Sequence, residues 1–100
     1  MNFVVKWTTE AKFTLNQNLD YLSKEWDVLT INNFLDRIDE VVNSIQQNPK
    51  LYPVHRKSDQ VYKCVINKHI TLFYRVSKSA NRIDLITFWN THQNPESLKI

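Results

Sequence analysis

The sequence predicts an α+β fold in which a pair of helices covers one face of a twisted, mostly antiparallel sheet. Three observations predict it. A short apolar run opens the chain, two long stretches of helical periodicity follow, and three strand-like runs come last. The predicted order is β-α-α-β-β-β, and placing both helices on one face is the economical arrangement for such a chain. One hundred residues suit a single domain over 1–100.

The first strand and the first helix follow from residues 3–26. The run FVVKW at 3–7 is a short strand, and Thr8 or Thr9 can cap the helix after it, because a threonine oxygen accepts free N–H groups of the first turn. Apolar residues then recur at steps of three and four and predict a helix over about 9–26: Ala11, Leu15, Leu19, Leu22 and Trp26.

The second helix is predicted over about 29–47. Its apolar residues form one wide face: Ile31, Phe34, Leu35, Ile38, Val41, Val42 and Ile45. A break near Asp27 separates the two helices, so we expect an antiparallel helical hairpin. Asn48-Pro49 and Pro53 end the second helix and begin a loop.

Three strands are predicted in the C-terminal half, over 61–66, 70–76 and 83–89. Asn67-Lys68 is the expected two-residue turn, since asparagine tolerates positive φ better than most residues. The middle strand alternates, with one face formed by Ile70, Leu72, Tyr74 and Val76, and the other by Thr71, Phe73 and Arg75. The chain has no glycine, so its tight turns should use Asn, Asp, Ser or Pro.

The charge is distributed unevenly along the chain. Residues 50–82 hold eight Lys or Arg and one acid, whereas residues 1–49 hold four bases and seven acids. The net charge of +3 therefore conceals a strongly basic sheet. Such a basic, aromatic surface suggests a nucleic acid or another polyanion as partner, or an acidic protein.

Several classes of function are disfavoured by what the sequence lacks. Without glycine there is no glycine-rich phosphate loop. The single Cys64 lies in a strand-like run and is expected to be a buried, inert thiol. His55, His69 and His92 share no ligand spacing with it, so we expect no metal site and no other cofactor. No serine sits in a nucleophile motif.

No segment of the sequence is typical of secretion or of a membrane span. The first residues lack a signal peptide's apolar stretch, and no apolar run approaches the ~20 residues that a membrane-spanning helix needs. A cytoplasmic protein without membrane contact is therefore expected.

The remaining candidates are cations, aromatics and one histidine in the basic half. Four of them can contact phosphate groups or a target: Arg56, Lys57, Lys63 and Arg75. Tyr62, Tyr74 and Trp89 can stack on bases or simply pack. His92 can move a proton near neutral pH, with Tyr74 as a further proton-handling candidate. Each also has a plain structural reading, as a solvated strand charge, a half-buried aromatic or a surface residue.

The order and spacing of five segments carry a family resemblance. They are Trp7 followed by Thr8-Thr9-Glu10-Ala11, the helical pair closing on Asn48-Pro49, Tyr62-Lys63 opening a strand, Lys68-His69-Ile70 leading into Leu72-Phe73-Tyr74-Arg75-Val76, and Gln93-Asn94-Pro95 before Leu98. Over nearly its whole length the chain resembles the RelE/ParE superfamily, the toxins of bacterial type II toxin–antitoxin systems, which include plasmid stabilization systems. The fold that this resemblance implies is the one predicted from periodicity.

The resemblance implies one of two activities. RelE-like members cleave mRNA on the ribosome with Lys and Arg side chains on the sheet, without a metal, and ParE-like members lack that constellation and poison DNA gyrase. Lys63 falls where RelE-like toxins carry a first strand lysine, but Val65 and Thr71 fall where they carry a further lysine and an arginine. His92 falls near a position where an arginine or a histidine is common.

We therefore expect a ParE-like toxin that inhibits growth through gyrase. A RelE-like endoribonuclease that uses Lys63, Arg75, His92 and Tyr74 is the alternative, and a non-toxic nucleic-acid-binding module is a second one. Both toxin readings imply a cognate antitoxin, whose acidic or amphipathic segment folds on the toxin to form a hetero-oligomer. Whether Arg75 faces solvent or pairs with an acid such as Asp84 stays open.

Overall fold

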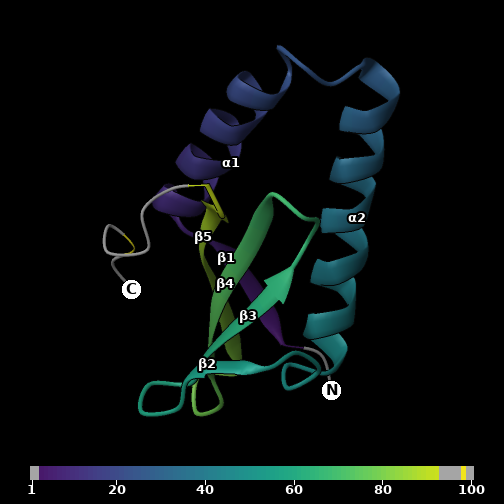
Figure 1. Cartoon of the computed structure of the whole chain (residues 1–100). Helices are drawn as coiled ribbons and strands as arrows, with labels where there is room; N and C mark the ends of the chain where they lie inside the picture. The colour runs from purple at the N-terminus through teal and green to yellow at the C-terminus, as the bar shows by residue number, and fades with distance from the viewer. Residues whose placement is uncertain (1–2, 93–97, 99–100) are drawn as a thin grey trace.

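Five strands form one sheet, and two helices lie against one of its faces (Figure 1). The computed structural model describes residues 3–92 and residue 98. Its elements are β1 (Val4–Trp7), α1 (Thr9–Leu22), α2 (Val28–Gln47), β2 (Val54–Arg56), β3 (Val61–Val65), β4 (Ile70–Ser77) and β5 (Arg82–Asn90). The strand order is β1-β5-β4-β3-β2, with β1 parallel to β5 and the other neighbours antiparallel. The predicted α+β class is confirmed.

Both helices begin at a side-chain cap. The N–H of Ala11 donates to Thr8 Oγ1 at 3.1 Å, which selects Thr8 from the two predicted caps of α1. Asp27 accepts from the N–H of Thr30 at 2.8 Å and so starts α2. Hydrogen bonding from the Thr30 side chain, and next from its backbone N–H, lowers the pKa of the Asp27 carboxyl, because it stabilises the charged form.

The first helix ends at Leu22, four residues before the predicted end at Trp26. The N–H groups of Glu25 and Trp26 both donate to the carbonyl of Leu22, so the chain turns there instead of continuing. Trp26 nevertheless packs on the core, with its ring 5.7 Å from that of Phe34. The apolar spacing therefore predicted the burial of Trp26 correctly but not its secondary structure.

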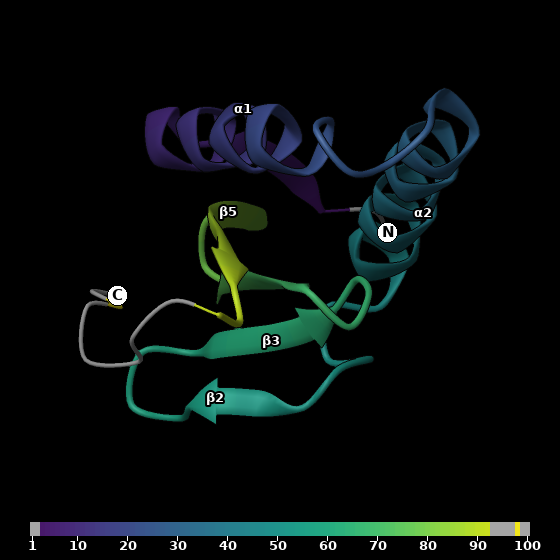
Figure 2. The ribbon, with the colours of Figure 1, turned by 45° about the horizontal axis from the view of Figure 1, so that its top comes forward.

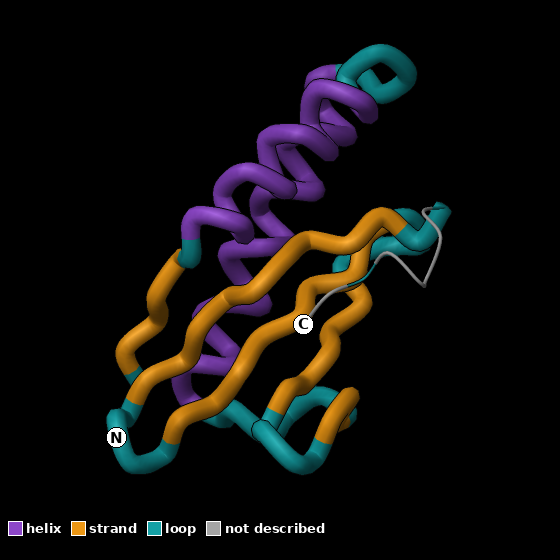
Figure 3. Tube along the Cα trace, turned by 90° about the vertical axis from the view of Figure 1, so that its left-hand side faces the viewer, coloured by secondary structure: helices purple, strands orange, loops and turns teal. Residues whose placement is uncertain are grey.

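The two helices diverge from the short link between them and pack separately on the sheet. In Figure 2, α1 lies over β5 while α2 runs beside the sheet, and in Figure 3 both lie behind the strands. The hairpin is therefore connected as predicted but open. Its two arms cover different parts of the same sheet face.

The core lies between this face and the helices. Alternation in β4 is as predicted, with the side chains of Ile70, Leu72, Tyr74 and Val76 all buried against the helices. From α2 the core receives Phe34, Ile38, Val41 and Ile45. Each large apolar side chain buried here stabilises the fold by about 1.5–3 kcal/mol relative to exposure.

The connections differ from the prediction at three points. A short strand, β2, precedes β3 and was missed. The β3–β4 turn spans residues 66–69 and is longer than the predicted two residues. Asn67 does not adopt positive φ there; its Oδ1 accepts from the N–H groups of His69 and Ile70 and so stabilises the turn. Positive φ occurs at Gln60 (57°) and Asn81 (52°), of which only asparagine was expected.

No helix in the described part of the chain is long and apolar enough to cross a bilayer.

Candidate functional site

The sheet face opposite the helices carries Lys63, exposed in β3 and paired with Phe73 of β4. Val65 pairs with Thr71, and Thr71 in turn pairs with Trp89 of β5, so these three side chains form a row beside Lys63. Val65 is 60% exposed. The two positions at which the sequence lacks an expected cation are thus neighbours on the sheet face that carries Lys63, and both hold uncharged side chains.

A second group of cations lies at the end of the sheet formed by the β2–β3 loop. Arg56 holds Asp59 through two hydrogen bonds, from Nε and Nη2, each of 2.7 Å. Arg75 Nη2 donates to the same carboxylate at 3.2 Å. The bonds from Arg56, with a smaller contribution from Arg75, lower the pKa of Asp59 to about 2. Two of the candidate phosphate-binding cations therefore share one acid.

This arrangement answers how Arg75 is oriented. It pairs with Asp59, although Asp84 lies opposite it in the β4–β5 register. Asp84 pairs with Arg82 instead, at 2.9 Å between Nε and Oδ1. Lys57, the fourth candidate, is an exposed residue of the same β2–β3 loop.

Tyr74 lies in the core. Its side chain is fully buried, and its hydroxyl donates to the carbonyl of Pro49 at 2.9 Å. Burial raises the pKa of this hydroxyl. The ring stacks on that of Tyr62, which is also buried, at 5.6 Å between centroids. Tyr74 is fully buried and Tyr62 is 7% exposed, so both rings serve mainly to pack the core.

His92 lies at the other end of the sheet and forms a pair with His69. Nδ1 of His69 is 3.0 Å from Nε2 of His92, so a proton can be shared between, or transferred across, the two imidazoles. The backbone N–H of Thr91 donates to the carbonyl of His69 at 2.8 Å, which fixes the end of β5 to the β3–β4 turn. No functional role was predicted for His69. Ile70 pairs with Asn90 in the β4–β5 register, and this pairing places His69 close to His92.

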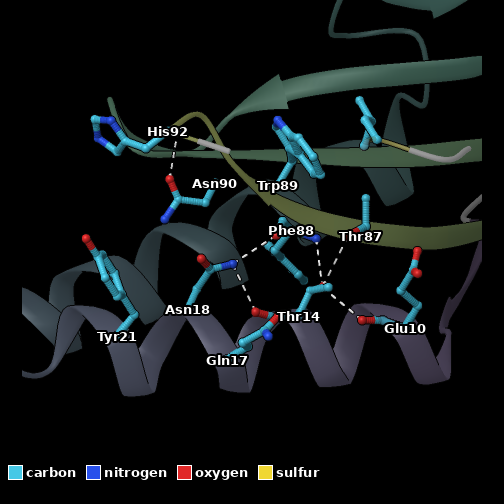
Figure 4. Close-up of a pocket in the computed structure, with 11 residues that line it drawn as sticks. Glu10, Thr14, Gln17, Asn18, Tyr21, Thr87, Phe88, Trp89, Asn90 and His92 are labelled. Atoms are coloured by element: carbon cyan, nitrogen blue, oxygen red, sulfur yellow. Dashed lines mark hydrogen bonds between the residues drawn. The ribbon is translucent and has the colours of Figure 1, made fainter. Parts of the chain in front are cut away.

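A cavity of about 500 Å³ lies beside His92, between α1 and β5 (Figure 4). On its α1 side, Thr14 Oγ1 accepts from the N–H of Phe88 at 3.0 Å, and Asn18 Nδ2 donates to the Phe88 carbonyl at 2.9 Å. These two hydrogen bonds satisfy the backbone N–H and carbonyl of Phe88 at the edge of β5, beyond the point where β1 ends. Asn90, whose Oδ1 accepts from the N–H of His92, lies on the opposite wall.

The candidate residues therefore fall into separate groups. His92 lies at one end of the sheet, Arg56, Lys57 and Arg75 lie at the other, and Lys63 lies between them, beside the uncharged Val65 and Thr71. Within residues 3–92 and 98, no three His, Cys, Asp or Glu side chains gather as metal ligands would. Cys64 is fully buried.

Several solved structures with this fold come from toxin–antitoxin systems. A YoeB/ParE toxin from Agrobacterium tumefaciens is 14% identical, with a TM-score of 0.62 over 89% of this chain and 99% of the other. The RelBE2 toxin–antitoxin complex from Mycobacterium tuberculosis contains a chain that is 12% identical, with a TM-score of 0.61 over 90% and 99%. The YoeB dimer from Staphylococcus aureus is 17% identical, with a TM-score of 0.59 over 93% and 100%.

Sequence comparison gives the family. No curated protein sequence matches significantly. The family described as ParE toxin of type II toxin-antitoxin system, parDE, matches residues 5–95. Because this match covers most of the chain, and the fold agrees with it, the chain belongs to the ParE toxin family of type II toxin–antitoxin systems.

Proposed function

We propose that this protein inhibits growth by binding DNA gyrase, without cutting RNA, and that a cognate antitoxin neutralises it. The observation that carries the proposal is that few of the candidate cations on the sheet lack an acidic partner. Lys63 stands beside Val65 and Thr71, while Arg56 and Arg75 are both bound to Asp59.

RNA cleavage by attack of a 2′-hydroxyl needs positive groups at the phosphate as its charge rises, together with a base and an acid. An arginine that already pairs with a carboxylate attracts a phosphate less strongly, because the negative carboxylate repels the negative phosphate. The residue that could move a proton, His92, lies at the end of the sheet away from Arg75. This separation favours a toxin that acts by binding.

The test is supercoiling of plasmid DNA by purified gyrase with added toxin. We expect inhibition and trapped cleavage complexes at micromolar toxin. If gyrase supercoils normally and no cleavage complex is trapped, the gyrase proposal is wrong.

One observation favours a second candidate, a ribosome-dependent endoribonuclease. The 3.0 Å contact between the imidazoles of His69 and His92 would supply a group that takes and returns a proton. This candidate predicts that translated mRNA is cut after induction and that His92→Ala abolishes the cuts. Intact mRNA in cells whose growth has stopped would exclude it.

The antitoxin is part of the proposal, and two similar structures support it. The RelBE2 chains and the YoeB–YefM chains were solved as toxin–antitoxin complexes. An acidic or amphipathic antitoxin segment would complement the excess of Lys and Arg over residues 50–82. Both proposed targets work in the cytoplasm, so the proposal includes that location.

A further inference from the structure

A second groove, of about 460 Å³, lies between the first half of α2 and the β3–β4 turn, and neither Lys63 nor His92 lines it. In Figure 1 the connection from β3 to β4 approaches α2 at this point. The floor of the groove is formed by Trp26, Phe34 and Ile66. Phe34 and Ile66 are almost fully buried, so the floor is fixed by the core below it.

Two large apolar side chains are exposed at the start of α2, outside the lining of the groove. Val28 and Leu29 are 74% and 68% exposed there. Large apolar side chains that are exposed beside an apolar groove are typical of a surface that another molecule covers.

The rim of the groove is cationic. Arg37 of α2 and Lys68 of the turn flank the floor, and His69 lies beside Trp26 with 5.9 Å between the ring centroids. Among the described residues that line the groove, none is acidic. Charge complementarity therefore favours an acidic partner.

Two amide side chains and Thr30 complete the lining. Asn33 is exposed on α2, and Asn67 lies in the turn. The oxygen of Asn67 already accepts from the N–H groups of His69 and Ile70, so its NH₂ group is the part that can donate to a partner. Neutral amides of this kind pair well with the backbone of a peptide.

We propose that this groove binds an acidic segment of the antitoxin that inserts an aliphatic side chain between Trp26 and Ile66. The inference rests on the antitoxin that is part of the proposed function. A helical or extended segment of that kind supplies apolar anchors at regular spacing and carboxylates between them, which matches this floor and rim. Single-stranded nucleic acid fits less well, because stacking needs an open aromatic face and the Trp26 ring already contacts Phe34 and His69.

The test measures the affinity of the purified cognate antitoxin for toxin variants. Asn33→Trp blocks the groove with a large ring, and Asn32→Trp is its matched control, because Asn32 is exposed on the same helix but does not line the groove. Lys68→Glu reverses a rim charge, and Lys12→Glu, an exposed residue of α1, is its control. We expect each groove variant to weaken binding by about tenfold or more at low salt, and both controls to bind as the wild type does.

The outcomes separate this inference from the proposed target. Toxicity and gyrase inhibition are measured without antitoxin, so their failure bears only on the target. If Asn33→Trp and Lys68→Glu bind antitoxin as tightly as Asn32→Trp and Lys12→Glu, the groove is not the docking site. If the groove variants instead lose binding to a single-stranded RNA while they keep the antitoxin, the occupant is wrong.

Discussion

The two ends of the sheet use their polar side chains in opposite ways. At the β2–β3 end, Arg56, Asp59 and Arg75 are bound to one another, and the hydroxyl of Tyr74 is bound to the loop after α2. At the other end, His69 and His92 contact each other, and His92 lies at the wall of a cavity (Figure 4). The first end holds three of the four candidate cations, and two of these are paired with Asp59, whereas the second end holds none of the four and leaves His92 exposed.

The difference teaches that residue type does not tell whether a group is available for function. Arg75 and His92 were equal candidates in the sequence. In the structure, Arg75 contributes to a charge pair within the fold, and His92 is exposed at a cavity wall. Availability depends on the partners that the fold brings near, and three substitutions test this contrast.

The largest effect is expected at the His92 end, from Asn18→Ala. Asn18 is buried, and its loss leaves the Phe88 carbonyl without its side-chain donor, which costs about 1–3 kcal/mol of unfolding free energy. Urea unfolding measures the change. Asn16→Ala, at an exposed position of the same helix, is the control and should unfold like the wild type. Equal stability of the two variants would mean that α1 does not hold the end of β5.

A smaller effect is expected from Tyr74→Phe at the other end. The variant keeps the ring in the core but loses the bond to Pro49, which costs about 0.5–1.5 kcal/mol. Growth inhibition should not change. Tyr21→Phe, at an exposed residue of α1, controls for loss of a hydroxyl and should leave stability unchanged. A stable Tyr74→Phe protein without toxicity would return Tyr74 to the functional site.

Most of the fold follows from periodicity, because burial on one face imposes a repeat on the sequence. The alternation of β4 predicts that Tyr74 shares a face with Leu72, and the buried Tyr74 side chain agrees with this and not with a proton-handling role. The end of α1 was missed because a turn can bury Trp26 as well as a helix can. The strand β2 has only three residues, too few for a pattern.

The site was less predictable, because its contacts join residues that are distant in the sequence. The neutral positions Val65 and Thr71 could be read directly, since they are neighbours across one turn. The bond between Arg75 and Asp59 spans sixteen residues, and the contact between His69 and His92 spans 23. Both depend on strand register and on side-chain rotamers, which a single sequence does not give.

The smallest effect on stability is expected from Asp59→Asn, and it should depend on pH. The pKa of Asp59 is lowered from 3.8 to about 2 in the folded protein, so its contribution to stability is present above 3.8 and is lost as the pH falls toward 2. The wild type should therefore be more stable than Asp59→Asn at neutral pH, and the difference should shrink below pH 3.8 and be lost as the pH falls through about 2. Asp36→Asn, at an exposed residue of α2, is the control for removing one negative charge.

Asp59→Asn also tests whether Arg56 and Arg75 can bind nucleic acid once their acidic partner is removed. Without the carboxylate, Arg56 and Arg75 can turn to phosphates, so binding to single-stranded RNA should strengthen and depend more steeply on salt. Each additional phosphate that the variant neutralises should steepen the slope of log K against log salt by about 0.7. If the slope equals that of the Asp36→Asn control, the pairing with Asp59 is not what withholds these arginines from nucleic acid. The contrast between the two ends would then lie in the position of Arg56 and Arg75 on the sheet and not in their charge.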